Sequence, residues 1–279
     1  MYPEIVRIGD FVISSYGLMM VLAFVAGNIL LRKDLSDGRN GYSIEQGQTL
    51  ADDLIFYAAF GGIAGAKIYY LIEGIPSGAA ADNIRGISDI FEGIFTLSFS
   101  KISLGIQNFG AGLVFLGGFI GGVLALTLYI RKNNLNWLNT MDWLAPLLAL
   151  GHGIGRIGCF LVGDDYGKPS DLPWAIAFPN GIPPTDVPVH PTQLYEMTCY
   201  FLIFAYLRYF VTNQRNRFKG QIFCEFLFLH GLSRFVIEFV RVNPKYLLGL
   251  SGAQIISAIM IITGTIMMYR LRTSDKQIP

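Results

Sequence analysis

The sequence predicts an all-α, polytopic integral membrane protein with about seven transmembrane helices. Of its 279 residues, 52% are hydrophobic and 15% are charged, whereas ordinary soluble domains carry roughly 25% charged residues. The mean hydropathy is positive. Seven apolar runs also reach the length of about 20 residues that a helix needs to cross a bilayer. Together these observations indicate a protein embedded in a membrane.

The seven predicted spans are distributed along the whole chain. They are centred on residues 11–31, 52–72, 109–130, 142–162, 192–211, 221–240 and 251–271. The first run is too long for the core of a signal peptide and has no small-residue cleavage site behind it, so we expect it to stay attached. The sequence shows no internal repeat of the kind that is typical of secondary transporters. We therefore expect a single transmembrane domain over residues 1–279.

Two connections between the predicted spans are long. Residues 73–108 contain the stretch DIFEGIFTLSFSKISLGIQ, residues 89–107, whose weak alternation fits either an interfacial hairpin or a helix. Residues 163–191 are rich in proline and cannot form one continuous helix.

The positions of lysine and arginine predict the orientation of the chain, because cytoplasmic loops carry an excess of both. Eleven of these residues lie on the side of the C-terminus. Six lie at the N-terminus and in the loops on its side: Arg7, Arg85, Lys101, Lys168, Arg241 and Lys245. We therefore expect the N-terminus and both long loops outside and the C-terminus in the cytoplasm.

Composition and spacing argue against nucleic acid, metal and cofactor. The net charge is +1, and no basic run with interleaved aromatic residues is present, so no nucleic-acid partner is expected. The cysteines fall in apolar segments without zinc-ligand spacing. His152, His190 and His230 lie on different segments, and none has a carboxylate or thiolate spaced as a local ligand pair. No glycine loop follows a strand to hold a nucleotide. We predict no metal and no cofactor.

Glycines four residues apart occur in several predicted spans, and this spacing lets helices approach closely. The pairs are Gly61 and Gly65, Gly117 and Gly121, Gly118 and Gly122, and Gly151 and Gly155. They predict packing and carry no information on function.

Several cations lie inside the apolar segments. Arg208 is near enough to a cytoplasmic end to extend its guanidinium into water. Lys67, Arg156 and Arg234 are not. Because a cation at the bilayer centre costs about 2.5 to 3.5 kcal/mol, each needs a polar cavity or a substrate, or a structural ion pair between helices.

Two predicted spans repeat one pattern of polar residues. His152 and Arg156 are four residues apart on the fourth span, and His230, Arg234 and Glu238 have the same interval on the sixth. Residues at this interval share one face of a helix. We therefore expect both faces to look into one shared cavity, with Glu238 holding Arg234 in place.

Two converging arginines suit a phosphate group, because the planar guanidinium donates two parallel hydrogen bonds to its oxygens. In a membrane, a lipid headgroup is the available phosphate. The motif HPTQLYE adds His190 and Glu196 at the outer mouth of the fifth span. All the histidines of the chain thus fall in these groups, which favours a functional site.

Motifs of one enzyme family follow one another along most of the chain. They read SSYGLMMVLAF (14–24), FGGIAGAKIYYL (60–71), GLVFLGGFIGG (112–122), MDWLAPLLALGHGIGRIGCFLVGDDYG (141–167), LPWAIAFP (172–179), HPTQLYE (190–196), RFVIEFVR (234–241) and GLSGAQIIS (249–257). The GRxGxF stretch with a downstream HPxQLYE is the most specific combination. At these residues the sequence resembles the prolipoprotein diacylglyceryl transferases, which are bacterial membrane enzymes.

The resemblance implies a reaction, two substrates and a location. The family moves a diacylglyceryl group from phosphatidylglycerol to the thiol of a lipobox cysteine, at the signal peptide of a prolipoprotein. The products are a thioether and glycerol phosphate. The resemblance also implies a multi-pass protein of the bacterial inner membrane, with seven spans and an outside N-terminus.

The resemblance implies roles for individual residues. Arg156 in GRxGxF and Arg234 in RFxxEF match the essential arginines of the family and suit a clamp on the phosphate. The other matches are Tyr16 of the first span, Gly167 closing the signature, Asp164 where the family has glutamate, and His190 and Glu196 of HPxQLYE.

The sequence departs from the family pattern at three positions. Leu116 replaces the histidine of a His-Gly-Gly motif that is proposed to assist the thiol, Cys159 replaces an asparagine, and His230 replaces a tyrosine. Leucine cannot accept a proton. Our hypothesis is that His152 or His230 restores the missing proton acceptor from another helix.

Three alternatives to the transferase stay open at the level of sequence. The first is a divergent paralogue that binds an anionic phospholipid and serves a different acceptor. The second is a lipid-binding or transport protein whose arginines hold a headgroup without cleaving it. The third is a structural membrane scaffold, which would not need so many embedded charges.

Overall fold

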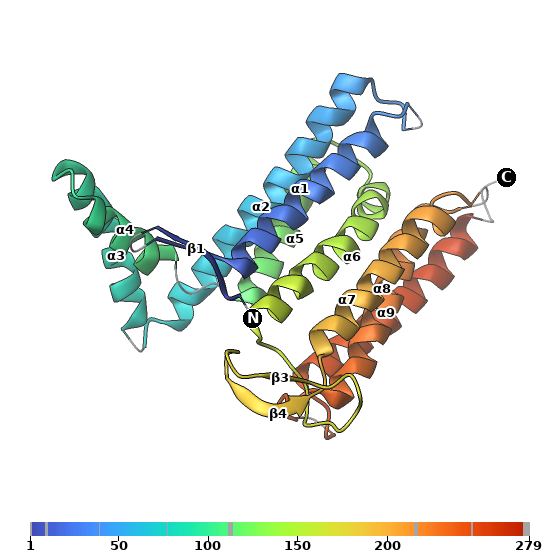
Figure 1. Ribbon diagram of the computed structural model, residues 1–279. Coiled ribbons are helices and arrows are strands. Elements are labelled where there is room, and N and C mark those ends of the chain that lie inside the picture. The colour runs from blue at the N-terminus through green and yellow to red at the C-terminus, as the bar shows by residue number, and fades with distance from the viewer. Residues whose placement is uncertain are drawn as a thin grey trace. The chain divides into compact units, whose positions relative to one another are not determined.

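The computed structural model describes residues 2–8, 11–38, 40–76, 78–110, 114–214, 217–246 and 248–275. Most of them are helical (Figure 1). The helices are α1 Ser15–Leu35, α2 Ile44–Glu73, α3 Ala79–Phe95, α4 Phe99–Gly110, α5 Phe115–Lys132, α6 Trp137–Val162, α7 Thr192–Ala205, α8 Gln221–Ile237 and α9 Gly252–Asp275. A π-helical stretch, Tyr206–Val211, continues α7, and a 3₁₀ turn, Glu238–Val240, continues α8.

Two small antiparallel sheets accompany the helices. Strand β1, Glu4–Ile8, pairs with β2, Phe11–Ser14, and β3, Ile176–Phe178, pairs with β4, Thr185–Val189. The prediction of a purely α fold is therefore wrong in detail, although the mostly helical character is confirmed. These four strands read EIVRI, FVIS, IAF and TDVPV, and none alternates strictly between apolar and polar residues, which is the pattern that identifies a strand in a sequence.

Within the described residues, four helices are long and apolar enough to cross a membrane: α1, α2, α6 and α9. The other three predicted spans coincide with α5, α7 and α8, which have 18, 14 and 17 residues. The first span begins later than predicted. Ser14, the last residue of β2, caps α1 by accepting a hydrogen bond from the Gly17 amide at 3.1 Å.

The two long connections adopt different structures. Residues 73–108 contain most of a helical hairpin, α3 and α4, in which the backbones meet at Gly86 and Gly105. Residues 89–107 thus contain the end of α3, a turn and most of α4, so this segment is helical and also turns back as a hairpin. Residues 163–191 contain β3 and β4 with irregular backbone between them, as the prolines predict.

Contacts along the chain define two compact units. The first comprises Met1–Glu4, Ser14–Gln48 and Asn136–Pro279, and the second comprises Ile5–Ile13 and Thr49–Leu135. Every predicted site residue lies in the first unit. The single domain over residues 1–279 stays a prediction.

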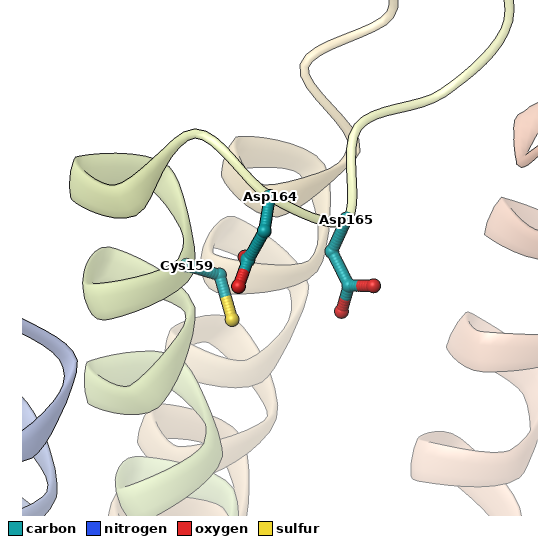
Figure 2. A group of neighbouring side chains, drawn as sticks. All are labelled: Cys159, Asp164 and Asp165. Atoms are coloured by element: carbon teal, nitrogen blue, oxygen red, sulfur yellow. The ribbon is translucent and has the colours of Figure 1, made fainter. Parts of the chain in front are cut away.

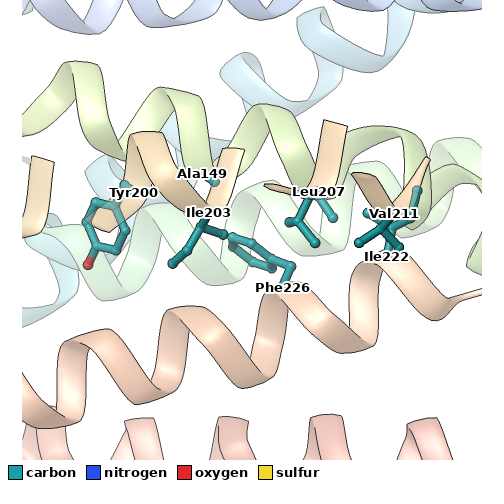
Figure 3. Packing of buried hydrophobic residues seen from close by; sticks show 8 residues of the cluster. Ala149, Tyr200, Ile203, Leu207, Val211, Ile222 and Phe226 are labelled. Carbon is teal, nitrogen blue, oxygen red and sulfur yellow. The ribbon is translucent and has the colours of Figure 1, made fainter. Parts of the chain in front are cut away.

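Three helices of the first unit surround an apolar cluster (Figure 3). Ala145 and Ala149 contribute from α6, and Ile222 and Phe226 contribute from α8. Tyr200, Ile203, Leu207 and Val211 line the side formed by α7 and its π-helical continuation. Burying such side chains stabilises the packing by roughly 1.5 to 3 kcal/mol each for the larger ones.

A buried aspartate of α6 fixes the beginning of α8. Asp142 accepts hydrogen bonds from the backbone amides of Gly220, at 2.8 Å, and Phe223, at 2.9 Å. These amides belong to the first turn of α8 and have no partner within the helix. The capping carboxylate therefore aligns α8 with α6, and so aligns the polar residues further along both helices.

The embedded cations outside the predicted site are paired. Arg208 was expected to reach water, but it forms an ion pair with Asp34 of α1, with Nη2 to Oδ1 at 2.7 Å. In the second unit, Lys67 donates to the carbonyl of Phe109 and lies 4.4 Å from the centre of its ring. Backbone and ring stabilise the ammonium group together.

Glycine spacing produces close packing in the second unit. A Cβ atom added to Gly121 of α5 would overlap the carbonyl of Gly61 and lie 2.7 Å from the Cα of Gly65. The predicted close approach is therefore present between α2 and α5. The spacing of Gly151 and Gly155 makes no such crossing, because a Cβ at Gly155 would meet nothing within 4 Å.

Replacing Gly121 by alanine should destabilise the second unit by about 1 to 3 kcal/mol, because the added methyl forces the two backbones apart. Thermal unfolding of the purified protein in detergent measures the effect. Gly62→Ala is the control, since a Cβ at Gly62 would meet only the Gly118 carbonyl, at 3.8 Å. Equal unfolding temperatures for the two variants would contradict the packing argument.

Candidate functional site

Three helices of the first unit carry polar residues one helical turn apart, and these residues form two adjoining layers. Helix α6 contributes His152 and Arg156, α7 contributes Glu196 and Tyr200, and α8 contributes His230 and Arg234. One layer is ionic, through Arg156, Glu196 and Arg234. The second layer is aromatic, through the other three.

Glu196 lies at the centre of the ionic layer. Its side chain has 0% exposure, and its two oxygens form ion pairs with Nε of Arg156 and Nη1 of Arg234. Arg241, which follows the 3₁₀ turn after α8, approaches the same carboxylate at 3.4 Å. An isolated buried carboxylate would be very costly, and the three guanidiniums offset that cost by pairing with Glu196.

Two further carboxylates complete the network. Glu238 lies 3.3 Å from Nη2 of Arg234, as the sequence predicted, and 3.6 Å from Nε of Arg241. Asp165, in the segment after α6, joins Nη1 of Arg156 at 2.6 Å to Nη2 of Arg241 at 2.7 Å. Three arginines and three carboxylates therefore balance one another in formal charge.

Asp165 differs from the other carboxylates in exposure and backbone. Its side chain is 44% exposed, and its φ of +60° lies in the left-handed region. Burial pushes the pKa of Asp165 upward, but Arg241 and Arg156 outweigh burial and lower the pKa below 3.8. Burial and the charge of Asp165 instead raise the pKa of the neighbouring Asp164.

The aromatic layer is a stack of two imidazoles and a phenol. The ring centres of His152 and His230 are 4.8 Å apart, and Tyr200 lies parallel to His230 at 4.9 Å. Nδ1 of both histidines is buried and has no hydrogen-bond partner within the described residues. The two histidines thus face each other, one turn away from the arginines, whereas the shared cavity between the two helix faces stays a prediction.

The HPTQLYE motif and Gly167 meet beside the ionic layer. The amide of Gly167 donates to the carbonyl of His190 at 2.9 Å. A Cβ at Gly167 would lie 2.5 Å from the carbonyl of Val240 and 2.9 Å from Cβ of His190. Only glycine allows this approach. His190 also contacts the Tyr195 hydroxyl at 3.3 Å, and that hydroxyl accepts a hydrogen bond from Trp174 at 2.7 Å.

Tyr16 lies on α1 against the GRxG turn of α6. A Cβ at Gly158 would lie 3.1 Å from the Cα of Tyr16 and 3.2 Å from its ring. The side chain of Tyr16 is exposed rather than buried. Tyr16 is thus next to the segment that carries Arg156.

A cysteine and two aspartates gather where α6 ends (Figure 2). Ligand atoms of Cys159, Asp164 and Asp165 lie within 4.8 Å of one another. Both oxygens of Asp165 already contact guanidiniums, and Arg156 donates to the Cys159 sulfur at 3.4 Å. These positive neighbours oppose a cation, so the group belongs to the arginine network.

Sequence reasoning missed two members of the network. Arg241 was counted among loop cations, although it lies seven residues after Arg234 and three after Glu238, a spacing that would place it on the same face if the helix continued. That spacing could have identified Arg241. Asp165 had no comparable signal, because its position depends on an irregular turn.

Comparison with known proteins identifies one enzyme family. The profile of the family described as prolipoprotein diacylglyceryl transferase matches residues 3–270. The chain belongs to the prolipoprotein diacylglyceryl transferase family. It is 34% identical over 282 residues to the phosphatidylglycerol–prolipoprotein diacylglyceryl transferase of Bordetella avium (strain 197N), with 99% of this chain and 97% of the relative covered. The enzyme of the same name from Clostridium tetani (strain Massachusetts / E88) is 32% identical, with 95% of each chain covered.

The three departures from the family pattern lie at different places in the fold. Cys159 lies beside Arg156, and His230 belongs to the aromatic layer and lies against His152. Leu116 lies on α5, in the second unit.

Replacing Glu196 by glutamine should destabilise the protein by about 3 to 5 kcal/mol, because the arginines around it would lose their shared counter-ion while staying buried. Thermal unfolding in detergent measures the loss. Asp186→Asn is the matched control, since it removes one carboxylate charge from an exposed position of β4. If Glu196→Gln unfolded at the wild-type temperature, Glu196 would not be the central counter-ion.

Proposed function

We propose that this protein transfers a diacylglyceryl group from phosphatidylglycerol to the thiol of a lipobox cysteine in a prolipoprotein. The observation that carries the proposal is the convergence of Arg156, Arg234 and Arg241 on one buried carboxylate. This convergence occurs in a chain that the family profile matches over nearly its full length. The reaction makes a thioether and releases glycerol phosphate, which marks a place in lipoprotein biosynthesis.

The reaction requires a site for a phosphate leaving group. The thiolate sulfur attacks a glycerol carbon of the lipid, the bond between that carbon and the phosphate oxygen breaks, and its electron pair stays on the phosphate. Negative charge therefore grows on the phosphate in the transition state. Arg156 and Arg234 stabilise that charge, because guanidiniums held in place by Glu196 and Glu238 need no reorganisation.

The thiol proton also needs an acceptor. His152 and His230 are the candidates, because each carries a buried, unpartnered Nδ1 one turn from an arginine of the network. Their ring centres are 4.8 Å apart, so a charge on either ring acts on the other. Tyr16, Asp164, Gly167 and His190 complete the proposed site around the substrate.

We infer that the chain crosses the bacterial inner membrane seven times, through α1, α2, α5, α6, α7 with its π-helical continuation, α8 and α9. The excess of lysine and arginine on the side of the C-terminus supports a cytoplasmic C-terminus and an outside N-terminus. The Asp165 and HPTQLYE end of the site then faces outward, where the signal peptide of a translocated prolipoprotein would arrive.

The direct test is complementation of a bacterial strain depleted of its own transferase. Mass spectrometry of a lipobox peptide then detects the added diacylglyceryl mass. Growth together with the mass increase supports the proposal. A well-expressed protein that adds no mass in the presence of phosphatidylglycerol contradicts it and favours the paralogue with another acceptor.

Replacing Arg156 or Arg234 by glutamine should lower the transfer rate by roughly 100- to 1,000-fold, the usual effect of removing one transition-state donor. The rate is measured with purified enzyme in phosphatidylglycerol vesicles. Arg272→Gln is the matched control, because it removes one arginine charge from an exposed turn of α9. Rates within a factor of two of wild type for both site variants would contradict the proposal that these arginines hold the phosphate.

If His152 or His230 is the base that accepts the thiol proton, replacing that histidine should lower the transfer rate. The loss should be greatest at low pH, where less thiolate forms spontaneously. Alanine also opens a gap in the aromatic stack, so His152→Phe and His230→Phe serve as variants that keep a ring and remove the base. The pH profile of the rate is measured for each variant. If all of these histidine variants kept wild-type rates while Arg156→Ala abolished transfer, the hypothesis that His152 or His230 accepts the thiol proton would be wrong.

A further inference from the structure

Asp165 occupies a distinctive place among the carboxylates of the network. One of its oxygens lies 2.6 Å from Arg156 and the other lies 2.7 Å from Arg241. Its carboxylate thus bridges guanidiniums from two segments. This is the arrangement in which two oxygens of a phosphate would accept hydrogen bonds from the same two side chains.

Exposure separates Asp165 from the other two acids. Its side chain is 44% exposed, whereas the side chains of Glu196 and Glu238 are 0% and 1% exposed. A buried carboxylate that left its arginines would have no water to solvate it, and the cost would be several kcal/mol. Asp165 can exchange an arginine for water at far lower cost.

The backbone at Asp165 supports the same distinction. Its φ of +60° is uncommon for a residue with a side chain, although aspartate tolerates this region better than most. Asp165 lies in irregular chain between α6 and β3, beyond the helix end that Gly163 forms with a φ of +76°. The segment therefore has no helical hydrogen bonds to break when the side chain moves.

We propose that Asp165 is a displaceable internal anion that competes with the phosphate of the substrate and of the product for Arg156 and Arg241. The inference rests on the proposed function in taking that phosphate from phosphatidylglycerol. A guanidinium N–H that donates to Asp165 cannot at the same time donate to a phosphate oxygen, so binding of one releases the other. After transfer, the returning carboxylate weakens the hold on glycerol phosphate and favours its departure.

Competition predicts a specific effect of removing the charge. If the Asp165 pairs are formed in about nine molecules of ten without ligand, their loss raises the apparent affinity for a phosphate roughly tenfold. Asp165→Asn should therefore lower the dissociation constant for glycerol phosphate and its inhibition constant about tenfold. The KM for phosphatidylglycerol should fall as well. The kcat should also fall, because product leaves more slowly.

The experiment uses the full-length protein in detergent. Isothermal titration measures binding of glycerol phosphate and, separately, of inorganic phosphate, and phosphatidylglycerol vesicles provide the kinetic arm. Asp165→Glu keeps the charge and should bind glycerol phosphate more weakly than Asp165→Asn does. Asp186→Asn removes a charge from the exposed strand β4 and should change neither binding nor KM.

The outcomes separate competition from a structural role. Tighter phosphate binding by Asp165→Asn supports the proposal. Unchanged binding overturns it, and weaker binding also overturns it, because Asp165 would then only hold the arginines in place. The binding measurement needs no turnover. If Asp165→Asn bound phosphate more tightly in a protein that transfers no lipid, the competition of Asp165 with phosphate would be supported and the proposed function would be rejected.

Discussion

The first unit depends on one carboxylate that has no contact with solvent. Glu196 forms ion pairs with arginines of α6, of α8 and of the segment after α8. None of these charges could remain alone in an apolar interior, so each helix is stable in its position only when the others are present. The apolar cluster of the same three helices supplies the attraction that holds them together.

The register of α8 against α6 is fixed at two places. At its beginning, Asp142 accepts hydrogen bonds from two backbone amides. Toward its other end, Arg234 contacts Glu196 of α7, and the same carboxylate contacts Arg156 of α6. A helix held at both ends can neither slide nor rotate freely, which is the rigidity that an electrostatic catalytic site requires. The histidine stack lies between the two attachments.

The sequence predicted much of the site from helical spacing. His152 and Arg156, and likewise His230 and Arg234, share helix faces, so their meeting followed from two periodic segments. The role of Glu196 as the shared counter-ion did not follow, because it depends on which helices become neighbours. Asp165 and β3 with β4 depend on irregular backbone, for which periodicity gives no signal. The helix ends were also displaced, since α1 begins only after the β2 strand.

The order of the charged residues along the chain bears on biogenesis. Arg156 leaves the ribosome before Asp165 and Glu196, and Arg234 and Arg241 follow later still. Helix α6 alone would place an uncompensated cation in hydrocarbon, at a cost of about 2.5 to 3.5 kcal/mol. The charge of Arg156 is neutralised by Glu196 of α7, so the placement of α6 in lipid is coupled to its assembly with a helix that is synthesised later.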